Sequence, residues 1–201
     1  MPYFLPEGYT QRLDNEFFDD VHFKEQYPDE PEYQMEVYQI ARTIYDKYSC
    51  KSVADIGCGS AEKLLRLFGD ADTLGVDVGD TVPALMEKYP NRRWESCEIY
   101  DFFAPPQADL VICADTLEHI PDPDDMMSLI KEFCPQVIVF STPDRSLRAD
   151  QSSPPRNRSH CREWSFQEFR AYVGEWFTVD GHLITNRAQL TQCIIARPKV
   201  S

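Results

Sequence analysis

The sequence lacks the patterns that mark secreted, zinc-binding or membrane-spanning chains. Its seven cysteines include no C-x-x-C pair, which argues against a zinc site or a disulfide framework and predicts reduced, mostly buried thiols. No apolar run approaches the roughly 18 residues that a membrane helix needs. The first residues show no basic region followed by an apolar stretch, so no secretory signal is expected. These absences predict a cytoplasmic protein.

Positive charge is also scarce. There are 20 Lys and Arg residues against 34 Asp and Glu residues, which gives a formal net charge of −14. No basic stripe is visible, and an acidic surface repels phosphate backbones. Nucleic acid is therefore an unlikely partner on these grounds, and a small-molecule partner is expected.

What the sequence does contain is typical of a globular domain. Hydrophobic residues make up 42% and aromatic residues 12% of the 201 positions, enough for one domain with a full core. Residues 1–49 form an aromatic and acidic arm followed by a helix, and residues 50–201 form the main part of the same domain. The arm is expected to pack over the domain, either as an ordinary docked segment or as a lid over a substrate.

One stretch organises the rest of the chain: Ser52 to Glu62, with the sequence SVADIGCGSAE. Its first half predicts a buried parallel strand, its glycines a tight turn, and the following AEKLLRLF a helix. This arrangement brings backbone amides and a helix N-terminus up to a polar ligand. Asp55 precedes the first glycine, and Asp77 ends the next apolar run, where a strand would place it against a pair of ribose hydroxyls.

The remaining chain alternates strands and helices. Strands are expected near residues 93–98, 108–115 and 136–143, with two further strands near the C-terminus that pair antiparallel. Start signals for helices occur at Asp122 and Ser165. The fold class is therefore α/β, a seven-stranded mixed sheet with helices on both faces, in three layers as in Rossmann-like proteins.

Two blocks, DIGCGSAEK and ADLVICADTLEHIPDP, resemble motifs of the class I S-adenosylmethionine-dependent methyltransferases. The first departs from the family pattern because Ala61 stands where the third glycine is usual. The resemblance implies the strand order 3-2-1-4-5-7-6 with the last strand reversed, and S-adenosylmethionine as the cofactor. S-adenosylhomocysteine would be the product. Glu62 stands where a dinucleotide fingerprint wants glycine, which disfavours an NAD-dependent oxidoreductase.

The resemblance also implies roles for individual residues. Asp55 would reach the cofactor ammonium, Asp77 would accept both ribose hydroxyls, and Glu98 would hold the adenine amino group. The glycine loop would line the methionine part and the ribose by its backbone, and the end of the fourth strand would border the sulfonium. The full cofactor set is Asp55, Gly57, Cys58, Gly59, Asp77, Val78, Glu98, Ile99, Ala114 and Asp115.

Two histidines are candidates for a general base, because imidazole titrates near neutral pH. His160 lies in the segment NRSHCREWS, which resembles an H-x-R-E-W-S segment of methyltransferases that modify glycans and sugars. His119 lies in the LEH sequence after the fourth strand, where a structural or cofactor-side role is the alternative. Asp115 is a third catalytic candidate at the strand end. His22 and His182 have no supporting neighbours and are expected to be structural.

The acceptor side is predicted from the same segment. Arg162, Glu163 and Trp164 are candidates for substrate binding, since arginine can clamp a carboxylate or phosphate with two parallel hydrogen bonds. The alternative is that Arg162 and Glu163 pin the loop while Trp164 fills the core. No metal is predicted, because the acidic run at Asp122 to Asp125 is explained by a helix N-terminus.

The sequence therefore predicts a methyltransferase that transfers a methyl group to oxygen or nitrogen of a small polar acceptor. A sugar, a nucleotide-sugar or a natural-product intermediate is the first expectation for this acceptor. A protein or nucleic-acid methyltransferase and a non-catalytic cofactor-binding subunit are the alternatives. The oligomeric state is not predicted.

Overall fold

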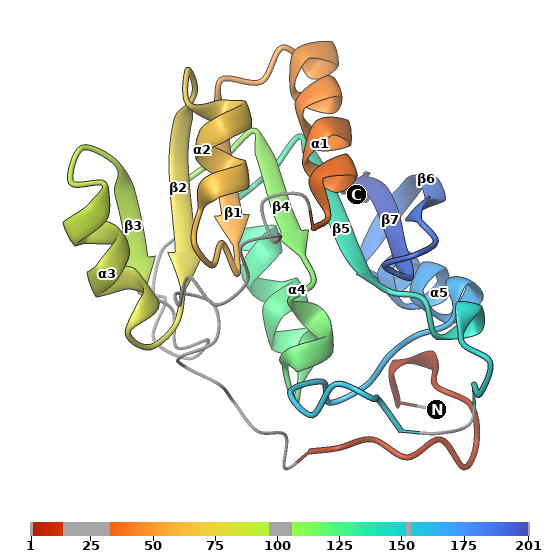
Figure 1. Ribbon diagram of the computed structural model, residues 1–201. Coiled ribbons are helices and arrows are strands. Elements are labelled where there is room, and N and C mark those ends of the chain that lie inside the picture. Colours follow the sequence, from red (N-terminus) through yellow and green to blue (C-terminus); the bar gives the residue numbers. More distant parts are fainter. Residues whose placement is uncertain (1, 14–32, 97–105, 152–153, 201) are drawn as a thin grey trace.

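The computed structural model describes residues 2–13, 33–96, 106–151 and 154–200. Its centre is a seven-stranded sheet in the order β3-β2-β1-β4-β5-β7-β6 (Figure 1), which confirms the predicted order. The pairs along β3 to β5 are parallel, whereas β7 runs antiparallel to both β5 and β6. The strands are β1 Ser52–Ile56, β2 Asp72–Asp77, β3 Arg93–Ser96, β4 Leu110–Ala114, β5 Val137–Pro143, β6 Phe177–Asn186 and β7 Thr191–Pro198.

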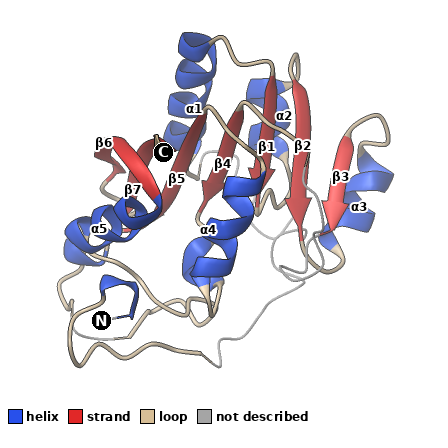
Figure 2. Ribbon diagram, turned by 180° about the vertical axis from the view of Figure 1, so that it is seen from behind, coloured by secondary structure: helices blue, strands red, loops and turns tan. Residues whose placement is uncertain are grey.

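Five α-helices of the described chain cover the two faces of the sheet (Figure 2). One face carries the first three helices and the other face carries the last two, and each layer packs on its own hydrophobic cluster. Neighbouring residues of one strand serve opposite clusters, as the alternation of side chains in a strand requires: Val53 packs with the first layer and Ala54 with the second. The helices are α1 Met35–Tyr48, α2 Glu62–Phe68, α3 Thr81–Lys88, α4 Pro123–Glu132 and α5 Phe166–Trp176.

The predicted helix starts are confirmed by their capping contacts. Asp122 precedes α4 and its carboxylate accepts the amide of Asp124 at 3.1 Å. Ser165 precedes α5 and forms a reciprocal capping box with Glu168. Each cap satisfies amides that a helix leaves without an internal partner in its first turn. The caps fix where the two polar connections before these helices end.

The described part of the N-terminal arm, residues 2–13, docks against the segment that precedes α5. The amide of Arg12 donates to the carbonyl of Cys161 at 2.8 Å, and the indole of Trp164 donates to the carbonyl of Tyr3 at 2.9 Å. The arm lies beyond the carboxyl ends of the parallel strands (Figure 1). The predicted packing of the arm is seen in these residues, and its role as a substrate lid stays a prediction.

The described cysteines agree with the expectation of reduced thiols. Six are free, and five of these are buried. Among the residues with described coordinates, no helix combines the length and apolar character needed to cross a membrane.

Candidate functional site

The turn after β1 is shaped by contact with the loop after β4. Gly57 has φ +75, and a Cβ atom on it would lie 2.2 Å from the hydroxyl oxygen of Thr116. That hydroxyl is held in place, since it donates at 3.1 Å to the carbonyl of Ile56 or of Ala114. Only glycine fits here, because a side chain meets both an unfavourable backbone conformation and an occupied space.

The amides of this turn are not bare, which corrects the expectation that they face the ligand. Gly57 and Cys58 donate to the carbonyl of Val76 at 2.8 and 3.2 Å, and Gly59 donates to the carboxylate of Asp77 at 2.7 Å. The amides of these three residues therefore donate to Val76 and Asp77 of β2. A ligand would meet the loop through its Cα atoms and carbonyl groups. The place of the turn residues in the cofactor site stays a prediction.

Asp77 ends β2 beside the turn, as the sequence predicts. One carboxylate oxygen accepts the amide of Gly59 at 2.7 Å and the other accepts the amide of Val78 at 2.8 Å. A carboxylate has about four acceptor positions, which is more than these two amides use. This arrangement holds the carboxylate in a fixed orientation and fits the proposed hydrogen bonds to two ribose hydroxyls.

Asp55 lies deeper, within β1, and is fully buried. Its partner is the hydroxyl of Tyr38 from α1, which lies 3.0 and 3.2 Å from the two carboxylate oxygens. Burial raises the pKa of Asp55 to about 7, against the opposing effects of the Tyr38 hydrogen bond and the positive charge of Lys63. An arriving ammonium group would favour the ionised carboxylate. Neither Tyr38 nor Lys63 is identified from the sequence, because they lie on two different helices, α1 and α2, and the local pattern does not reveal how these helices pack beside Asp55.

The end of β4 carries a second buried acid. Asp115 follows Ala114 with φ +48, and its carboxylate accepts the hydroxyl of Ser141 at 3.3 Å. Burial raises the pKa of Asp115 to about 6, although the charge of His160 opposes the shift. Asp115 therefore lies close to the histidine segment, and its place at the reacting end of the cofactor stays a prediction. Glu98 and Ile99, predicted to hold the adenine, lie outside the described residues.

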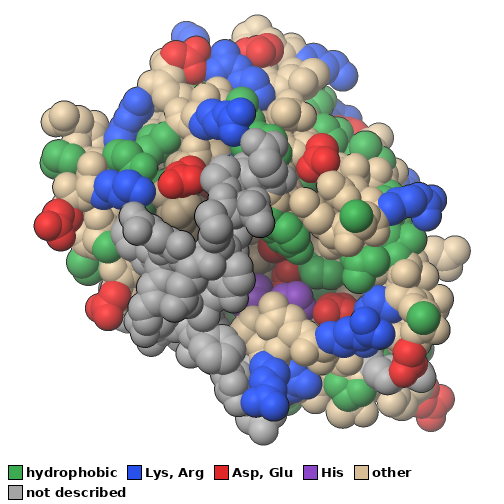
Figure 3. All heavy atoms as spheres, in the orientation of Figure 1, with side chains coloured by type: hydrophobic (Ala, Val, Ile, Leu, Met, Phe, Trp, Pro, Cys, Tyr) green, Lys and Arg blue, Asp and Glu red, His purple; other side chains and the backbone are tan. Residues whose placement is uncertain are grey.

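The two candidate histidines come together although they lie far apart in the sequence. The ring centroids of His119 and His160 are 4.6 Å apart with their planes at 89°. The segments are joined by their backbones, because the amide of Cys161 donates to the carbonyl of Glu118 at 2.7 Å. The Cys161 thiol also donates to the carbonyl of His119 at 3.2 Å. Figure 3 shows histidine and acidic side chains next to one another at a hollow on this face.

Glu118 belongs to the same cluster. Its side chain is fully buried, and neither carboxylate oxygen lies within hydrogen-bond geometry of a donor among the described residues. Burial raises the pKa of Glu118 well above its ordinary value and the nearby charge of Asp115 adds to the shift, while the backbone amide of Glu118 and the Thr142 hydroxyl oppose it. A buried carboxylate without a donor is costly, so it requires a proton or a cation.

His160 is oriented by a chain of buried groups. Its Nδ1 lies 3.1 Å from one carboxylate oxygen of Glu163, and the other oxygen accepts a 2.6 Å hydrogen bond from Arg148. Burial opposes ionisation, but the bonds with His160 and Arg148 prevail and lower the pKa of Glu163 below its ordinary value. The Nε2 atom of His160 lies 3.0 Å from the side-chain nitrogen of Asn157. Arg148 is not identified from the sequence, because its partner Glu163 lies 15 residues further along the chain.

The other two predicted acceptor residues face the protein interior. Arg162 is fully buried and donates to the side chain of Gln11 and to the carbonyls of Ile120 and Pro121, at 2.7, 2.6 and 2.6 Å. Trp164 is also fully buried and stacks on Tyr172 with ring centroids 5.4 Å apart. This placement agrees with the structural alternative, in which the segment is pinned by its own side chains. The predicted Arg162–Glu163 pair is replaced by Arg148–Glu163.

Three side chains of the cluster are able to ligate a metal ion. Glu118, His119 and His160 each offer one ligand atom, and these atoms lie within 4.8 Å of one another. Two imidazoles and one carboxylate form a common donor set for divalent transition metals. The acidic run at the start of α4, by contrast, is occupied by capping contacts.

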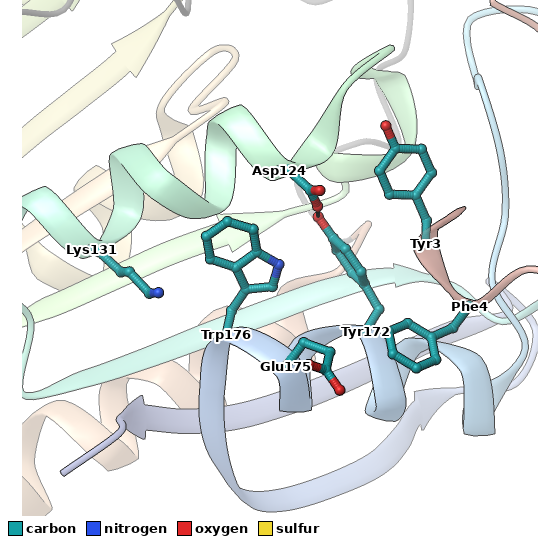
Figure 4. Close-up of a pocket in the computed structure, with 7 residues that line it drawn as sticks. All are labelled: Tyr3, Phe4, Asp124, Lys131, Tyr172, Glu175 and Trp176. Atoms are coloured by element: carbon teal, nitrogen blue, oxygen red, sulfur yellow. Dashed lines mark hydrogen bonds between the residues drawn. The ribbon is translucent and has the colours of Figure 1, made fainter. Parts of the chain in front are cut away.

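A separate hollow of about 510 Å³ lies between α4, α5 and the N-terminal arm (Figure 4). It contains none of the predicted site residues. The hydroxyl of Tyr172 crosses it to bond Asp124 at 2.9 Å, and Lys131 lies over the ring of Trp176. The lining residues are Tyr3, Phe4, Asp124, Lys131, Tyr172, Glu175 and Trp176.

The strand order and the layers of helices are those of the class I S-adenosylmethionine-dependent methyltransferase fold. Residues 10–185 match the family described as "Methyltransferase domain", and the chain belongs to this family. The predicted fold and the predicted family are thereby confirmed.

Curated relatives differ in their acceptors. The chain is 26% identical over 165 residues to a small RNA 2'-O-methyltransferase of Mus musculus, covering 68% of this chain and 40% of the relative. It is 29% identical over 111 residues to a ubiquinone biosynthesis O-methyltransferase of Methylococcus capsulatus, covering 49% of this chain and 46% of the relative. The chain therefore spans less than half the length of these relatives.

Solved structures show the same fold at low identity. The methyltransferase domain of bacterial CtHen1-C has a TM-score of 0.66 and 16% identity, with 83% of this chain and 99% of that chain covered. The N-methyltransferase NodS from Bradyrhizobium japonicum, solved with S-adenosylhomocysteine, has a TM-score of 0.67 and 14% identity, with 89% and 95% covered.

One expectation from the sequence is wrong. The net charge of −14 was taken to make nucleic acid an unlikely partner. A curated relative of this chain is a small RNA methyltransferase, so this argument from charge does not hold. Net charge sums over the whole surface, whereas an acceptor meets only the local field of the site.

Proposed function

We propose that this methyltransferase transfers the methyl group to a hydroxyl oxygen of a small, sugar-like acceptor. The observation that carries the proposal is the juxtaposition of Glu118, His119 and His160 beside Asp115 at the end of β4. A hydroxyl is a weak nucleophile at neutral pH, so a site that methylates it benefits from groups that take or weaken its proton. Both curated relatives above are O-methyltransferases, which supports oxygen over nitrogen.

The side chains around the glycine turn offer carboxylate groups that suit the polar groups of the cofactor. Asp55 is a buried carboxylate whose hydrogen-bond partner is a neutral hydroxyl, and it suits an ammonium group. Asp77 is held by two amides and suits a pair of ribose hydroxyls. S-adenosylmethionine supplies an electrophilic methyl group on a sulfonium.

The chain itself would bind the cofactor and the acceptor, align them for the reaction and keep water out of the site. Asp115 and the histidine cluster border the place where the acceptor hydroxyl would lie, and the hydroxyl is activated by this cluster. Holding nucleophile, methyl group and sulfur in line can contribute up to about 7 to 11 kcal/mol without a covalent enzyme intermediate. The segment before α5 and the N-terminal arm would shape the acceptor side, because both lie against the cluster.

A screen of acceptors tests this function. The purified chain is incubated with radiolabelled S-adenosylmethionine and a panel of sugars, nucleotide-sugars and catechols, and methylated products are identified by mass spectrometry. Label at a sugar hydroxyl supports the proposal. Label at nitrogen alone, or no binding of S-adenosylhomocysteine by calorimetry, contradicts it.

A second candidate is 2'-O-methylation of RNA, favoured by the similarity to the small RNA 2'-O-methyltransferase. The acceptor is again a sugar hydroxyl, so the same cluster serves both. A short RNA with a free 3' end belongs in the panel, beside the same RNA with a 2'-deoxy terminal nucleotide. Label on the first and none on the second supports this candidate over the small acceptor.

A further inference from the structure

We propose that Glu118, His119 and His160 form a site for a divalent transition-metal ion of the Mn²⁺ to Zn²⁺ type. The site belongs to the proposed hydroxyl methylation and rests on that function. It replaces the expectation that no metal is used and gives the two histidines a role other than that of a general base. Three potential ligand atoms from two distant segments lie within 4.8 Å of one another.

Glu118 needs either a proton or a cation, because the described residues provide no hydrogen-bond donor for its carboxylate. Its carboxylate is fully buried, and both oxygens lack a hydrogen-bond donor among those residues. Most buried carboxylates in folded proteins are paired, hydrogen-bonded or bound to a metal. The side chains that bring ligand atoms within 4.8 Å of the Glu118 carboxylate are the imidazoles of His119 and His160, which would bind the same cation. A cation among the three satisfies the carboxylate oxygens that the fold leaves without a donor.

The two histidines are oriented as metal-binding histidines are. The Nδ1 atom of His119 lies 3.1 Å from the carbonyl oxygen of Ser159, and that of His160 lies 3.1 Å from the carboxylate of Glu163. An acceptor at Nδ1 fixes the proton there and leaves Nε2 as the lone-pair atom, as is usual for histidines that bind metals. Arg148 holds Glu163 at 2.6 Å, so the supporting carboxylate is itself anchored.

The geometry requires a small closure. Two ligand atoms about 2.1 Å from one ion lie about 3 to 3.5 Å apart, which is closer than the 4.8 Å limit that the three atoms satisfy here. His160 Nε2 also lies 3.0 Å from the side-chain nitrogen of Asn157, and this contact must yield when the ion binds.

The donor set selects the kind of ion. Imidazole nitrogen suits transition metals such as Fe²⁺ and Zn²⁺, and the carboxylate of Glu118 also suits Mn²⁺, whereas Mg²⁺ prefers oxygen ligands alone. An ion held by three protein ligands keeps open positions, where the acceptor hydroxyl binds and becomes more acidic. The oxygen electron pair then forms the bond to the methyl carbon, the carbon–sulfur pair returns to sulfur, and the hydroxyl proton leaves to solvent.

Manganese binding tests the site independently of turnover. The protein is freed of metal with a chelator, saturated with S-adenosylhomocysteine, and titrated with Mn²⁺ followed by electron paramagnetic resonance and calorimetry. One ion is expected per chain. Glu118→Gln and His160→Ala are each expected to weaken binding at least about 100-fold, and Glu163→Gln to weaken it about 10-fold, because it disturbs only the support of His160.

Matched controls separate this site from adventitious binding. His182 lies on β6 and bonds Gln192 at 3.0 Å, and Asp125 belongs to the acidic start of α4. His182→Gln and Asp125→Asn are expected to leave Mn²⁺ affinity unchanged. Equal Mn²⁺ affinity of the wild type and Glu118→Gln, or one-for-one displacement of Mn²⁺ by equimolar Mg²⁺, would overturn the site.

The same titrations distinguish failure of the site from failure of the function. Binding of S-adenosylhomocysteine in every variant shows that the protein is folded and competent for cofactor. If the cofactor binds but Mn²⁺ and Zn²⁺ do not, the metal site is wrong and the methyltransferase function stands. Undiminished acceptor methylation in excess chelator also shows that the metal site is wrong. If methylation of hydroxyl acceptors fails while the metal binds, the proposed acceptor is wrong.

Discussion

Thr116 occupies the space in which a side chain at Gly57 would lie, with its hydroxyl oxygen 2.2 Å from where a Cβ atom would be. This contact joins the turn after β1 to the loop after β4, the two segments that carry the predicted cofactor and catalytic residues. Moving one segment therefore moves the other. This packing fixes the position of the turn after β1, where the cofactor is predicted to bind, relative to the histidine cluster.

The first prediction follows from that contact. Gly57→Ala introduces both a clash and a left-handed alanine, and it is expected to lower the free energy of unfolding by at least about 2 kcal/mol. Affinity for S-adenosylhomocysteine should fall with it. Gly174→Ala is the matched control, because Gly174 lies in α5 with open space around it and should gain about 0.5 to 1 kcal/mol. Chemical denaturation and calorimetry measure both; a stable, fully binding Gly57→Ala variant contradicts this expectation.

The second prediction divides the roles of the two halves of the site. Asp77→Ala is expected to weaken S-adenosylhomocysteine binding at least about 100-fold, because two ribose hydroxyls lose their acceptor. His160→Ala is expected to leave this affinity within about threefold and to abolish turnover. Asp72→Ala, at the exposed opposite end of β2, serves as the control for Asp77. Comparable loss of cofactor affinity in the Asp77 and His160 variants would refute the division.

The third prediction concerns pH. Burial raises the pKa of Asp55 to about 7, so a bound ammonium group must drive off a proton below that pH. Affinity for S-adenosylhomocysteine is expected to fall by up to about tenfold from about pH 7.5 to about pH 6, and Asp55→Asn should bind weakly with little dependence on pH. Calorimetry at several pH values checks this; a flat profile for the wild type contradicts it.

The raised pKa of Asp55 has the opposite effect on the stability of the ligand-free protein, which is favoured at low pH. The pKa of Asp55 is raised in the folded state, so neutral Asp55 contributes stability below about pH 4 that is lost as the pH rises through about 7. The free energy of unfolding gained by Asp55→Asn over the wild type should be larger at about pH 8 than at about pH 5. Urea unfolding at the two pH values decides the sign.

The fourth prediction distinguishes a structural Arg162 from one that binds substrate. Its guanidinium donates to Gln11, Ile120 and Pro121, so Arg162→Met removes the donor from the buried carbonyl of Ile120 and from the partly buried carbonyl of Pro121. A loss of about 3 kcal/mol or more in stability is expected. Arg170→Met, at an exposed position of α5, should change stability by less than about 0.5 kcal/mol. A stable Arg162→Met variant with a raised KM for the acceptor would support substrate binding instead.

Sequence patterns predicted the elements well where the local signal was strong. The capping residues Asp122 and Ser165 marked the starts of α4 and α5, because caps act within three or four residues. The position of Asp77 at the end of β2 followed from the length of one strand–helix unit. These features depend on neighbours in the chain, and they can therefore be predicted from the sequence alone.

Contacts between distant segments were missed or misjudged. Tyr38 hydrogen-bonds Asp55 across the helix–sheet interface, and Arg148 forms an ion pair with Glu163, which lies 15 residues further along the chain. The amides of the glycine turn were expected to face a ligand, but β2 takes them. Such pairings depend on how elements pack, and nothing in the local pattern predicts them.

The sequence by itself determined the alternation of strands and helices, the family and the acid that ends the second strand, because hydrophobic period, turn glycines and caps are local properties. Only the tertiary structure decided that Glu118 has no hydrogen-bond donor among the described residues and that the rings of His119 and His160 pack against each other in the same cluster. A buried charge and its neighbours are set by which segments the fold brings together, and that is decided by packing over the whole chain.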